Sequence, residues 1–331
     1  MSAEPRWIIG VDVGGTTLTV GAVPMDGGRP EAVRVQSTGR DTRGERIVSV
    51  LAGMVQATLD ELEELHGDGR DRVAGMGIGS PGPLDRTRGV VVETPNLGWR
   101  DFPLRDLLSE AVDLRATLDN DANCATYGEW WVGAGRNAGN VVGLTLGTGI
   151  GGGIVLDGEI LHGTSDVAGE IGHMTVSLDG RRCKCGNEGC LEAYASGPNI
   201  AARAVEGIRA GRRSILGDLV DGDLDRVTAA TVYDAIVRGD AYARQVMTET
   251  ARILGAGIAN LLNLLNPEVV VIAGGVTRAG EHLFEPLRAE ARRRAFKSAV
   301  DVCRIVPAQL PEMAGLVGAA GVYKKEAFGS V

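Results

Sequence analysis

Residues 7–23 read WIIGVDVGGTTLTVGAV, and residues 141–156 read VVGLTLGTGIGGGIVL. Each segment contains two apolar runs joined by glycine and threonine, which predicts two strands connected by a tight turn. The first strands are expected at 7–14 and 18–23, and the second at 141–146 and 154–156, with a turn at 147–153. Because the second half of the chain restarts the pattern of the first, we expect two related units.

Helices and strands alternate after each of these openings. Apolar residues at helical spacing predict helices at 43–65, 104–110, 122–132, 198–210, 228–237, 240–265, 280–296 and 313–327. Further strands are expected at 72–79, 115–118 and 269–273. The alternation indicates an α/β fold, and a length of 331 residues suits two domains. We expect a small lobe at 1–118, rejoined by a C-terminal helix at 313–331, and a large lobe at 119–312.

Glycine is the outlier in the composition. There are 49 glycines in 331 residues, about twice the usual share. The chain has only 12 prolines and no Gly-X-Y repeat, which excludes collagen and a low-complexity linker. The glycines are therefore expected where the backbone turns with positive φ or comes close to another group.

The charge and the N-terminal residues limit the partners and the location. A formal net charge of −9 argues against a general nucleic-acid binder. No apolar signal core precedes Trp7, and the longest uncharged run, 137–156, has too many glycines for a membrane span. We expect a cytoplasmic protein that binds neither nucleic acid nor membrane. In that compartment the five cysteines favour free thiols or a metal over disulfides.

The two glycine turns are candidate phosphate sites. The segment 147–152 matches G-x-G-x-x-G, but a dinucleotide site requires a helix directly after the loop, and a strand is expected here. The amides of a tight turn can still bind an anion, and the hydroxyls of Thr16, Thr17 and Thr148 add donors. A plain hairpin is the alternative for either turn. Asp12 is expected to hold Mg²⁺, which prefers carboxylates together with phosphate oxygens.

A second cluster has the spacing of metal ligands. The pattern H-x9-C-x-C-x4-C is formed by His173, Cys183, Cys185 and Cys190. Three thiolates and one imidazole complete the tetrahedral ligand set of a structural zinc. With no open position, a zinc ion would order the loop 173–190 and would not activate water. A loop with incidental thiols is the alternative. Cys124 and Cys303 lie in apolar patterns and are expected in the core.

Carboxylates are the candidates for catalysis and for binding a polyol. Asp121 lies where an expected strand meets an expected helix. This position suits an N-cap, and it equally suits a general base that the helix dipole keeps ionised. Glu170 and Glu192 flank the cysteine loop and, with Asn96, are candidates to accept hydrogen bonds from a polyol. Surface and turn roles are the alternatives for these three.

Six motifs occur together and in order: 12–17 (DVGGTT), 120–123 (NDAN), 146–153 (LGTGIGGG), 170–173 (EIGH), 183–192 (CKCGNEGCLE) and 273–276 (AGGV). On these motifs the chain resembles the ROK family of repressors and kinases, from about residue 7 to about residue 325. Within that family it is most similar to bacterial ATP-dependent glucokinases. The cysteine spacing together with Glu-x-Gly-His is the most specific part of the resemblance.

The resemblance implies a fold, a reaction and a set of site residues. The fold would be the two-lobe, actin-like (ribonuclease H-like) ATPase fold, with an interlobe cleft and a structural zinc loop. The reaction would be transfer of phosphate from ATP, with Mg²⁺, to the 6-hydroxyl of D-glucose. The implied sugar contacts are Gly82, Asn96, Asn120, Asp121 (the catalytic base), Glu170, His173 and Glu192. The implied ATP contacts are Gly14, Gly15, Thr16, Thr17, Gly147, Thr148 and Gly149 on the phosphates, and Gly274 and Gly275 on the adenosine.

Some expectations depart from the family or stay open. Many members have lysine where this chain has Thr17, so an ammonium group near the phosphates is missing. We expect no DNA-binding domain, because the first strand begins at residue 7. A homodimer or tetramer is implied by the resemblance only. The alternatives are a kinase for N-acetylglucosamine, N-acetylmannosamine, mannose or fructose, a polyphosphate-dependent enzyme, and a sugar sensor without catalysis.

Overall fold

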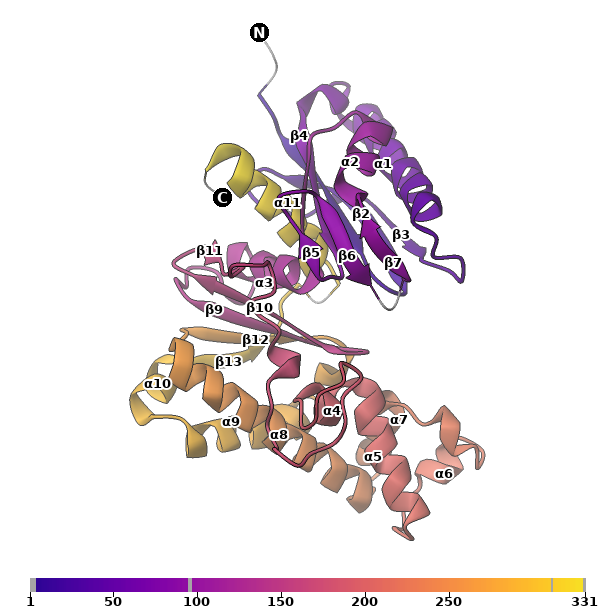
Figure 1. The fold of residues 1–331 in the computed structure, drawn as a ribbon, viewed down its shortest axis with the longest axis vertical. Coiled ribbons are helices and arrows are strands. Elements are labelled where there is room, and N and C mark those ends of the chain that lie inside the picture. The colour runs from indigo at the N-terminus through magenta and orange to yellow at the C-terminus, as the bar shows by residue number, and fades with distance from the viewer. Residues whose placement is uncertain (1–3, 95–96, 311, 330–331) are drawn as a thin grey trace. The chain divides into compact units, whose positions relative to one another are not determined.

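The computed structural model describes residues 4–94, 97–310 and 312–329. The chain forms two compact units (Figure 1). Unit 1 comprises Met1–Gly139, Gly153–Gly169 and Gln309–Val331, and unit 2 comprises Asn140–Gly152 and Glu170–Ala308.

The division differs from the boundary expected near residue 118. Residues 119–139 belong to unit 1, because helix α3 (Asp121–Trp131) packs against strand β4 (Val73–Ser80) and helix α11 (Ala314–Phe328). The C-terminal helix lies in unit 1, where it also packs against strand β1 (Trp7–Val13).

Unit 1 is built on a mixed sheet of five strands. The sheet order is β3 (Glu31–Ser37), β2 (Thr17–Pro24), β1, β4 and β8 (Ala116–Asn120). β1 and β2 are antiparallel, whereas β1, β4 and β8 are parallel. A separate sheet contains β5 (Leu84–Asp85), β6 (Val90–Thr94) and β7 (Trp99–Phe102). In the parallel part, Asp12 pairs with Gly79, and Gly79 pairs with Asp119. The carboxyl ends of three strands therefore lie at one edge.

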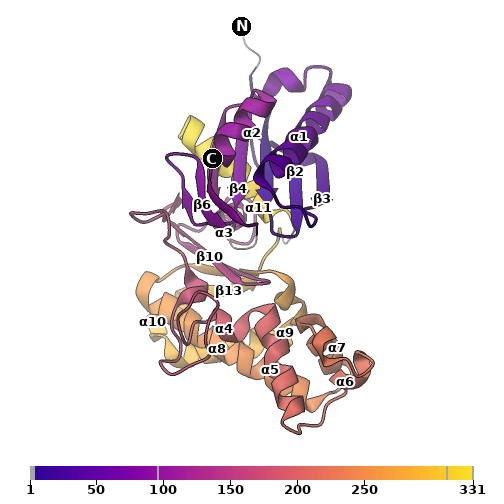
Figure 2. The same cartoon turned by 45° about the vertical axis from the view of Figure 1, so that its right-hand side comes forward.

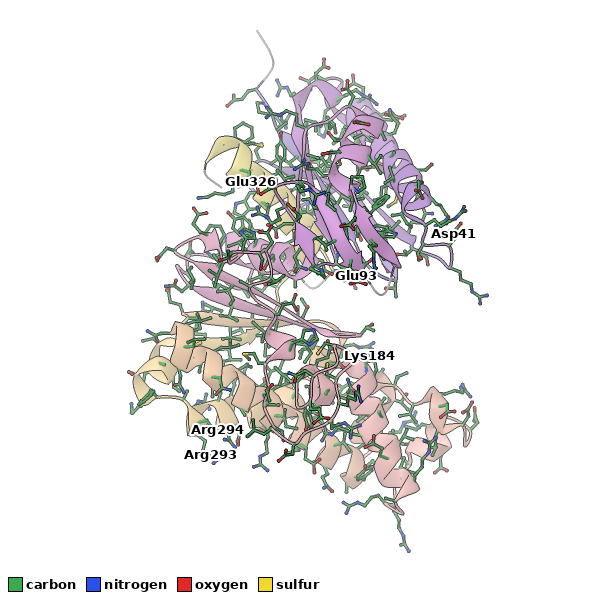
Figure 3. The ribbon with its side chains drawn as sticks, viewed as in Figure 1. Asp41, Glu93, Lys184, Arg293, Arg294 and Glu326 are labelled. Carbon is green, nitrogen blue, oxygen red and sulfur yellow. The ribbon has the colours of Figure 1, made fainter. Side chains whose placement is uncertain are left out.

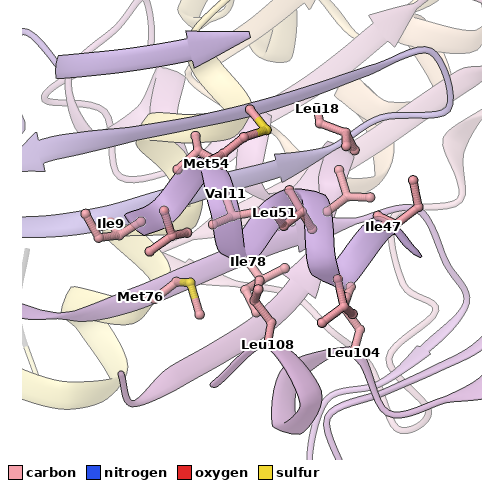
Figure 4. Close-up of a cluster of buried hydrophobic side chains, with 14 of the residues drawn as sticks. Ile9, Val11, Leu18, Ile47, Leu51, Met54, Met76, Ile78, Leu104 and Leu108 are labelled. Atoms are coloured by element: carbon pink, nitrogen blue, oxygen red, sulfur yellow. The ribbon is translucent and has the colours of Figure 1, made fainter. Parts of the chain in front are cut away.

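Helices cover both faces of this sheet. Alternate residues of β1 point to opposite faces. Ile9 and Val11 face α1 (Gly44–His66) and α2 (Leu104–Val112) in the cluster of Figure 4, whereas Ile8 packs with Leu316 and Val317 of α11. Figure 1 likewise shows α1 and α2 together on one side of the sheet. The core is mainly aliphatic, as the scarcity of aromatic residues requires.

Part of the glycine excess allows α11 to pack closely. A Cβ atom on Gly77 would lie 1.8 Å from the carbonyl oxygen of Ala319, and one on Gly10 would lie 2.3 Å from that of Leu316. On the helix itself, a Cβ atom on Gly318 would lie 1.6 Å from the carbonyl oxygen of Cys124. These glycines serve helix packing, a role that composition alone did not assign.

Unit 2 contains parallel strands covered by helices. β9 (Val141–Leu146), β12 (Val269–Ala273) and β13 (Arg304–Pro307) are parallel. They belong to a sheet of order β11-β10-β9-β12-β13, with β10 at Ile150–Leu156 and β11 at Glu159–Ile160. The residues of β10 from Gly153 onward and those of β11 are assigned to unit 1. The turn expected at 147–153 is shorter, because Ile150–Gly153 already belong to β10.

The helices of unit 2 follow the predicted periodicity. α8 (Ala241–Leu265) packs against α9 (Glu281–Arg294), α7 (Ala229–Val237) and α5 (Gly197–Arg209). Figure 2 shows α5 and α7 next to the short α6 (Leu216–Leu219). Two further short helices are α4 (Glu192–Ala195) and α10 (Lys297–Val302).

The cysteines follow the sequence expectation with one exception. All five are free thiols, and Cys124 is buried in α3. The prediction that Cys303 lies in the core is wrong, because this residue lies between α10 and β13 and is only half-buried. Among the described residues, no helix has the length and apolar composition to cross a membrane.

Candidate active site

Four of the predicted site residues of unit 1 lie at one edge of its sheet. Asp12 is near the end of β1, Gly82 follows the end of β4, and Asn120 and Asp121 lie where β8 meets α3. In α/β proteins, ligands bind outside the carboxyl ends of parallel strands, because loops diverge there. The parallel register therefore brings residues that are distant in the sequence to one edge.

The first glycine turn is a closed loop with outward-facing residues. The N–H of Gly14 donates to the carbonyl oxygen of Thr17 (2.8 Å), and the Thr38 hydroxyl donates to the carbonyl oxygen of Gly14 (2.8 Å). Gly15, Thr16 and Thr17 are exposed. The turn can thus present amide and hydroxyl donors to an anion.

At the start of α3, Asn120 is the N-cap. Its side-chain oxygen accepts hydrogen bonds from the N–H groups of Ala122 (2.9 Å) and Asn123 (3.2 Å). Asp121 is the first residue of the helix, and its carboxylate also accepts from the N–H of Ala122 (2.8 Å). The capping role left open for Asp121 is therefore filled by Asn120. The helix dipole favours a carboxylate in this first turn.

Asp12 and Asp121 interact electrostatically. Burial, and secondly the negative charge of Asp121, raise the pKa of Asp12 from 3.8 to about 7. Two carboxylates that repel each other fit a divalent cation, which would relieve the repulsion. Asp12 is thus suited to the Mg²⁺ that the sequence predicts there.

In unit 2, the second glycine turn follows β9. The N–H of Gly147 donates to the carbonyl oxygen of Gly149 (3.0 Å), and the N–H of Gly197 donates to the carbonyl oxygen of Gly147 (2.9 Å). Gly147 and Thr148 are exposed. The turn therefore presents backbone amides and the Thr148 hydroxyl to solvent. Its hydrogen bond with Gly197 joins it to the start of α5.

A cavity of about 440 Å³ adjoins this turn. It is lined by Gly147, Thr148, Pro198, Val227, Gly275 and Val276, among others. Gly274 has φ +94°, and a Cβ atom there would lie 2.3 Å from the carbonyl oxygen of Leu146. The size and the largely apolar wall suit a nucleoside. The structure thus brings Gly275 to the same cavity as the second turn.

The four predicted metal ligands lie together in unit 2. Their ligand atoms all lie within 4.8 Å of one another. The sulfur atoms of Cys185 and Cys190 are 3.7 Å apart, and Cys183 Sγ lies 3.8 Å from His173 Nδ1. Zinc–sulfur bonds of about 2.3 Å place two sulfurs of a tetrahedron about 3.8 Å apart. The cluster therefore fits zinc, and burial raises the pKa of the Cys183 thiol to about 12, so metal binding must displace a proton.

Two acidic residues adjoin this cluster. Nε2 of His173, the nitrogen directed away from the thiols, lies 3.9 Å from the exposed carboxylate of Glu170. Glu192 Oε1 lies 3.7 Å from Cys183 Sγ, and its Oε2 accepts the N–H of Ile150 (2.9 Å). Glu192 therefore connects the metal cluster with the second glycine turn.

The structure thus divides the predicted site residues between the units. Unit 1 holds Asp12, the first turn, Gly82, Asn120 and Asp121, and unit 2 holds the second turn, Gly274, Gly275, Glu170, Glu192 and the metal ligands. Asn96 lies outside the described residues. The sequence analysis assigned no role to Asp119. Its position, a charged residue at the end of a buried strand, could have indicated one.

The comparisons with known proteins agree with these motifs. The ROK family model matches residues 8–326. A glucokinase of Halalkalibacterium halodurans is 40% identical, covering 97% of this chain and 96% of that protein. A glucokinase of Thermotoga maritima is 38% identical, covering 96% of this chain and 97% of that protein.

The fold agrees with a solved structure of the same family. A ROK family glucokinase from Streptomyces griseus, in complex with glucose and AMPPNP, superposes with a TM-score of 0.80 at 36% identity. The match covers 96% of this chain and 98% of that one. With its mixed sheets, its motif order and a family match over nearly its whole length, the chain belongs to the ROK family.

Proposed function

We propose that this protein transfers the γ-phosphoryl group of ATP to the 6-hydroxyl of D-glucose. As a ROK protein similar to glucokinases over nearly its whole length, it is an ATP-dependent sugar kinase. The choice of glucose rests on the names of these relatives. The observation that best supports catalysis is the arrangement at the start of α3, where Asn120 caps the helix and the charge of the adjacent Asp121 acts on Asp12.

The two glycine turns are proposed to hold the phosphates of ATP. Exposed Gly15, Thr16 and Thr17 in unit 1 and Gly147 and Thr148 in unit 2 are the donors. The cavity beside Gly275 is proposed for the adenosine. Asp12 would hold Mg²⁺, which neutralises charge on the phosphates when bound. Backbone amides provide donors without a basic patch, which suits a chain with net charge −9.

Asp121 is the proposed general base. It would accept the proton of the sugar hydroxyl as this oxygen attacks the phosphorus atom in line with the leaving group. A carboxylate is a modest base, but in phosphoryl transfer positioning and charge stabilisation contribute most. Asn120, Gly82, Glu170, His173 and Glu192 are proposed to bind the remaining hydroxyls.

Zinc in the Cys183–Cys190 loop has a structural role in this proposal. Four protein ligands leave no open position for a reacting water. His173 would bind zinc through Nδ1 and orient Nε2 and Glu170 toward the sugar, since a ligating histidine commonly uses its second nitrogen for orientation. The metal would therefore shape the sugar site.

The reaction requires residues of both units to act on one sugar and one nucleotide. We propose that the units serve as the two lobes of an actin-like fold and exclude water from the reactants when they close. A cytoplasmic location and a homo-oligomer stay predictions.

The product tests this proposal. Incubation with D-glucose, ATP and Mg²⁺ should give a monophosphate whose ³¹P nucleus couples to the protons on carbon 6. The matched control is 6-deoxyglucose, which lacks the acceptor hydroxyl and should bind without consuming ATP. Phosphate on another carbon, or no sugar phosphate at all, contradicts the proposal.

A further inference from the structure

We infer that Asp119 is the positioning residue that presents Asn120 and Asp121 to the sugar. The inference rests on the proposed role of Asp121 as the base. Asp119 is 1% exposed and lies at the end of β8, directly before both residues. Its carboxylate forms four close contacts, two on each oxygen.

One oxygen of Asp119 fixes the local backbone. Oδ1 accepts hydrogen bonds from the N–H of Asn120 (2.7 Å) and from the side-chain amide of Asn123 (3.1 Å). Asn123 is 3% exposed and lies in the first turn of α3. The end of the strand and the start of the helix are thus joined across the two residues that carry the proposed chemistry.

The other oxygen joins this junction to two distant segments. Oδ2 lies 2.7 Å from Nε2 of His162, in the segment between β11 and Glu170. It also lies 3.0 Å from Nε of Arg86, which follows β5. A hydrogen bond or ion pair of a fully buried carboxylate is stronger than one at the surface.

Arg86 is itself held by further partners of unit 1. The guanidinium of Arg86 pairs with Glu326 of α11, which is labelled in Figure 3. The backbone N–H of Arg86 donates to the carboxylate of Asp166 (3.1 Å). The cluster of Asp119, Arg86, His162, Asp166 and Glu326 therefore joins β8 to three other parts of the unit. Loss of the Asp119 charge removes the group that both Arg86 and His162 contact.

A neutral amide cannot replace this carboxylate. If Asn at position 119 turned its oxygen toward Asn120 and Asn123, its NH₂ group would face Arg86, which has donors only. If it turned the other way, its NH₂ group would face the backbone N–H of Asn120 and the side-chain NH₂ of Asn123, which are both donors. Either orientation shifts the junction, and shifts of about 1 Å can cost about 10²-fold in rate.

The test compares Asp119→Asn with Glu129→Gln. Glu129 is an equally buried carboxylate of α3, which accepts the N–H groups of Ala134 (2.8 Å), Gln309 (3.1 Å) and Leu310 (2.6 Å) at the opposite end of the helix. Asp119→Asn should lower kcat by at least about tenfold, and the accompanying rise in the KM for glucose, from the displaced Asn120, should be smaller than the loss of kcat. Glu129→Gln should lower Tm without this kcat loss. Equal kcat losses at equal Tm would overturn the inference.

His162 provides a second test by conservative replacement. The amide nitrogen of Gln can take the position of His Nε2, so His162→Gln should keep most of the activity, whereas His162→Ala should lower kcat. An alanine variant as active as the wild type would contradict a role of His162 in holding Asp119.

Hydrogen exchange separates this inference from the proposed function. The amides of Ala122 and Asn123 should exchange faster in Asp119→Asn than in Glu129→Gln, whether or not glucose is the substrate. If the wild type fails to phosphorylate glucose but this difference appears, the proposed function fails and the positioning role stands. If the exchange rates of these amides are the same in both variants, the positioning role is wrong.

Discussion

The carboxylate of Glu192 accepts a hydrogen bond from the backbone N–H of Ile150 at 2.9 Å. The same oxygen lies so close to Gly149 that a Cβ atom there would be 2.6 Å away. Glu192 also follows Cys190 by two residues, so the helix that carries it begins at the metal cluster. A residue predicted only as a sugar ligand thus supports the turn predicted to bind phosphate.

We expect Glu192→Ala to weaken nucleotide binding in the absence of sugar. Without the carboxylate, the N–H of Ile150 loses its partner, and a hydrogen bond to a charged group contributes about 1.5–3 kcal/mol. Calorimetry with AMPPNP should show a several-fold higher Kd. Glu192→Gln keeps an acceptor and should bind AMPPNP nearly as the wild type does. Equal affinities of the wild type and the alanine variant would refute this coupling.

Zinc should be lost when one ligand of the cluster is removed. Cys185→Ser leaves three ligands, and the loop then lacks the metal that orders it. Elemental analysis should find about one zinc per wild-type chain and much less in the variant, with weaker glucose binding. Cys303→Ser is the matched control, because its thiol lies outside the cluster and zinc content should not change. A wild-type protein without zinc would contradict the assignment.

Asp12 should make the stability of the metal-free protein depend on pH. Its folded pKa of about 7 is above its ordinary value of 3.8, so the folded state binds an extra proton between these values. This contribution to stability is present below about pH 4 and is lost as the pH rises through about 7. Urea unfolding at pH 5 and pH 8 should show a decrease larger in the wild type than in Asp12→Asn, by on the order of 2 kcal/mol.

Mg²⁺ provides the control for this pH dependence. A bound cation favours the ionised carboxylate, so Mg²⁺ with ADP should reduce the loss of stability above pH 7 in the wild type and have less effect in Asp12→Asn. If both proteins show the same pH dependence, the carboxyl of Asp12 does not titrate in this range.

Replacement of the proposed base should separate binding from chemistry. Asp121→Asn keeps the size of the side chain but removes the proton acceptor, so kcat should decrease by about 10²–10⁴-fold while glucose binding stays measurable. The pKa of Asp12 should also decrease, because one cause of its shift is the Asp121 charge. A variant with nearly normal kcat would exclude Asp121 as the base.

Local patterns in the sequence were sufficient for much of the fold. The period of apolar residues located α1, α5, α7, α8, α9 and α11 within a few residues, because each buries one side over several turns. Short elements such as β5 and α10 were not predicted, since two to six residues carry too little pattern. The boundary between the units depends on α3 packing against α11, a long-range contact without a local signal.

The site was predictable where spacing itself fixes the chemistry. The four metal ligands are close in sequence, so their pattern indicated a common centre, and the structure brings them together. The contacts of Asp119 with Arg86 and His162 join three distant segments, and no motif connects them. Gly77 shows the same limit, because its reason for being glycine is the backbone of a helix more than 200 residues away.

Transfer of phosphate to a panel of sugars tests the central claim most directly. ADP release should be measured with D-glucose, mannose, fructose, N-acetylglucosamine and N-acetylmannosamine, and glucose phosphate formation with ATP or polyphosphate as donor. The proposed function predicts the highest kcat/KM for glucose with ATP. A higher kcat/KM for another sugar, transfer from polyphosphate alone, or binding of glucose without transfer would contradict it.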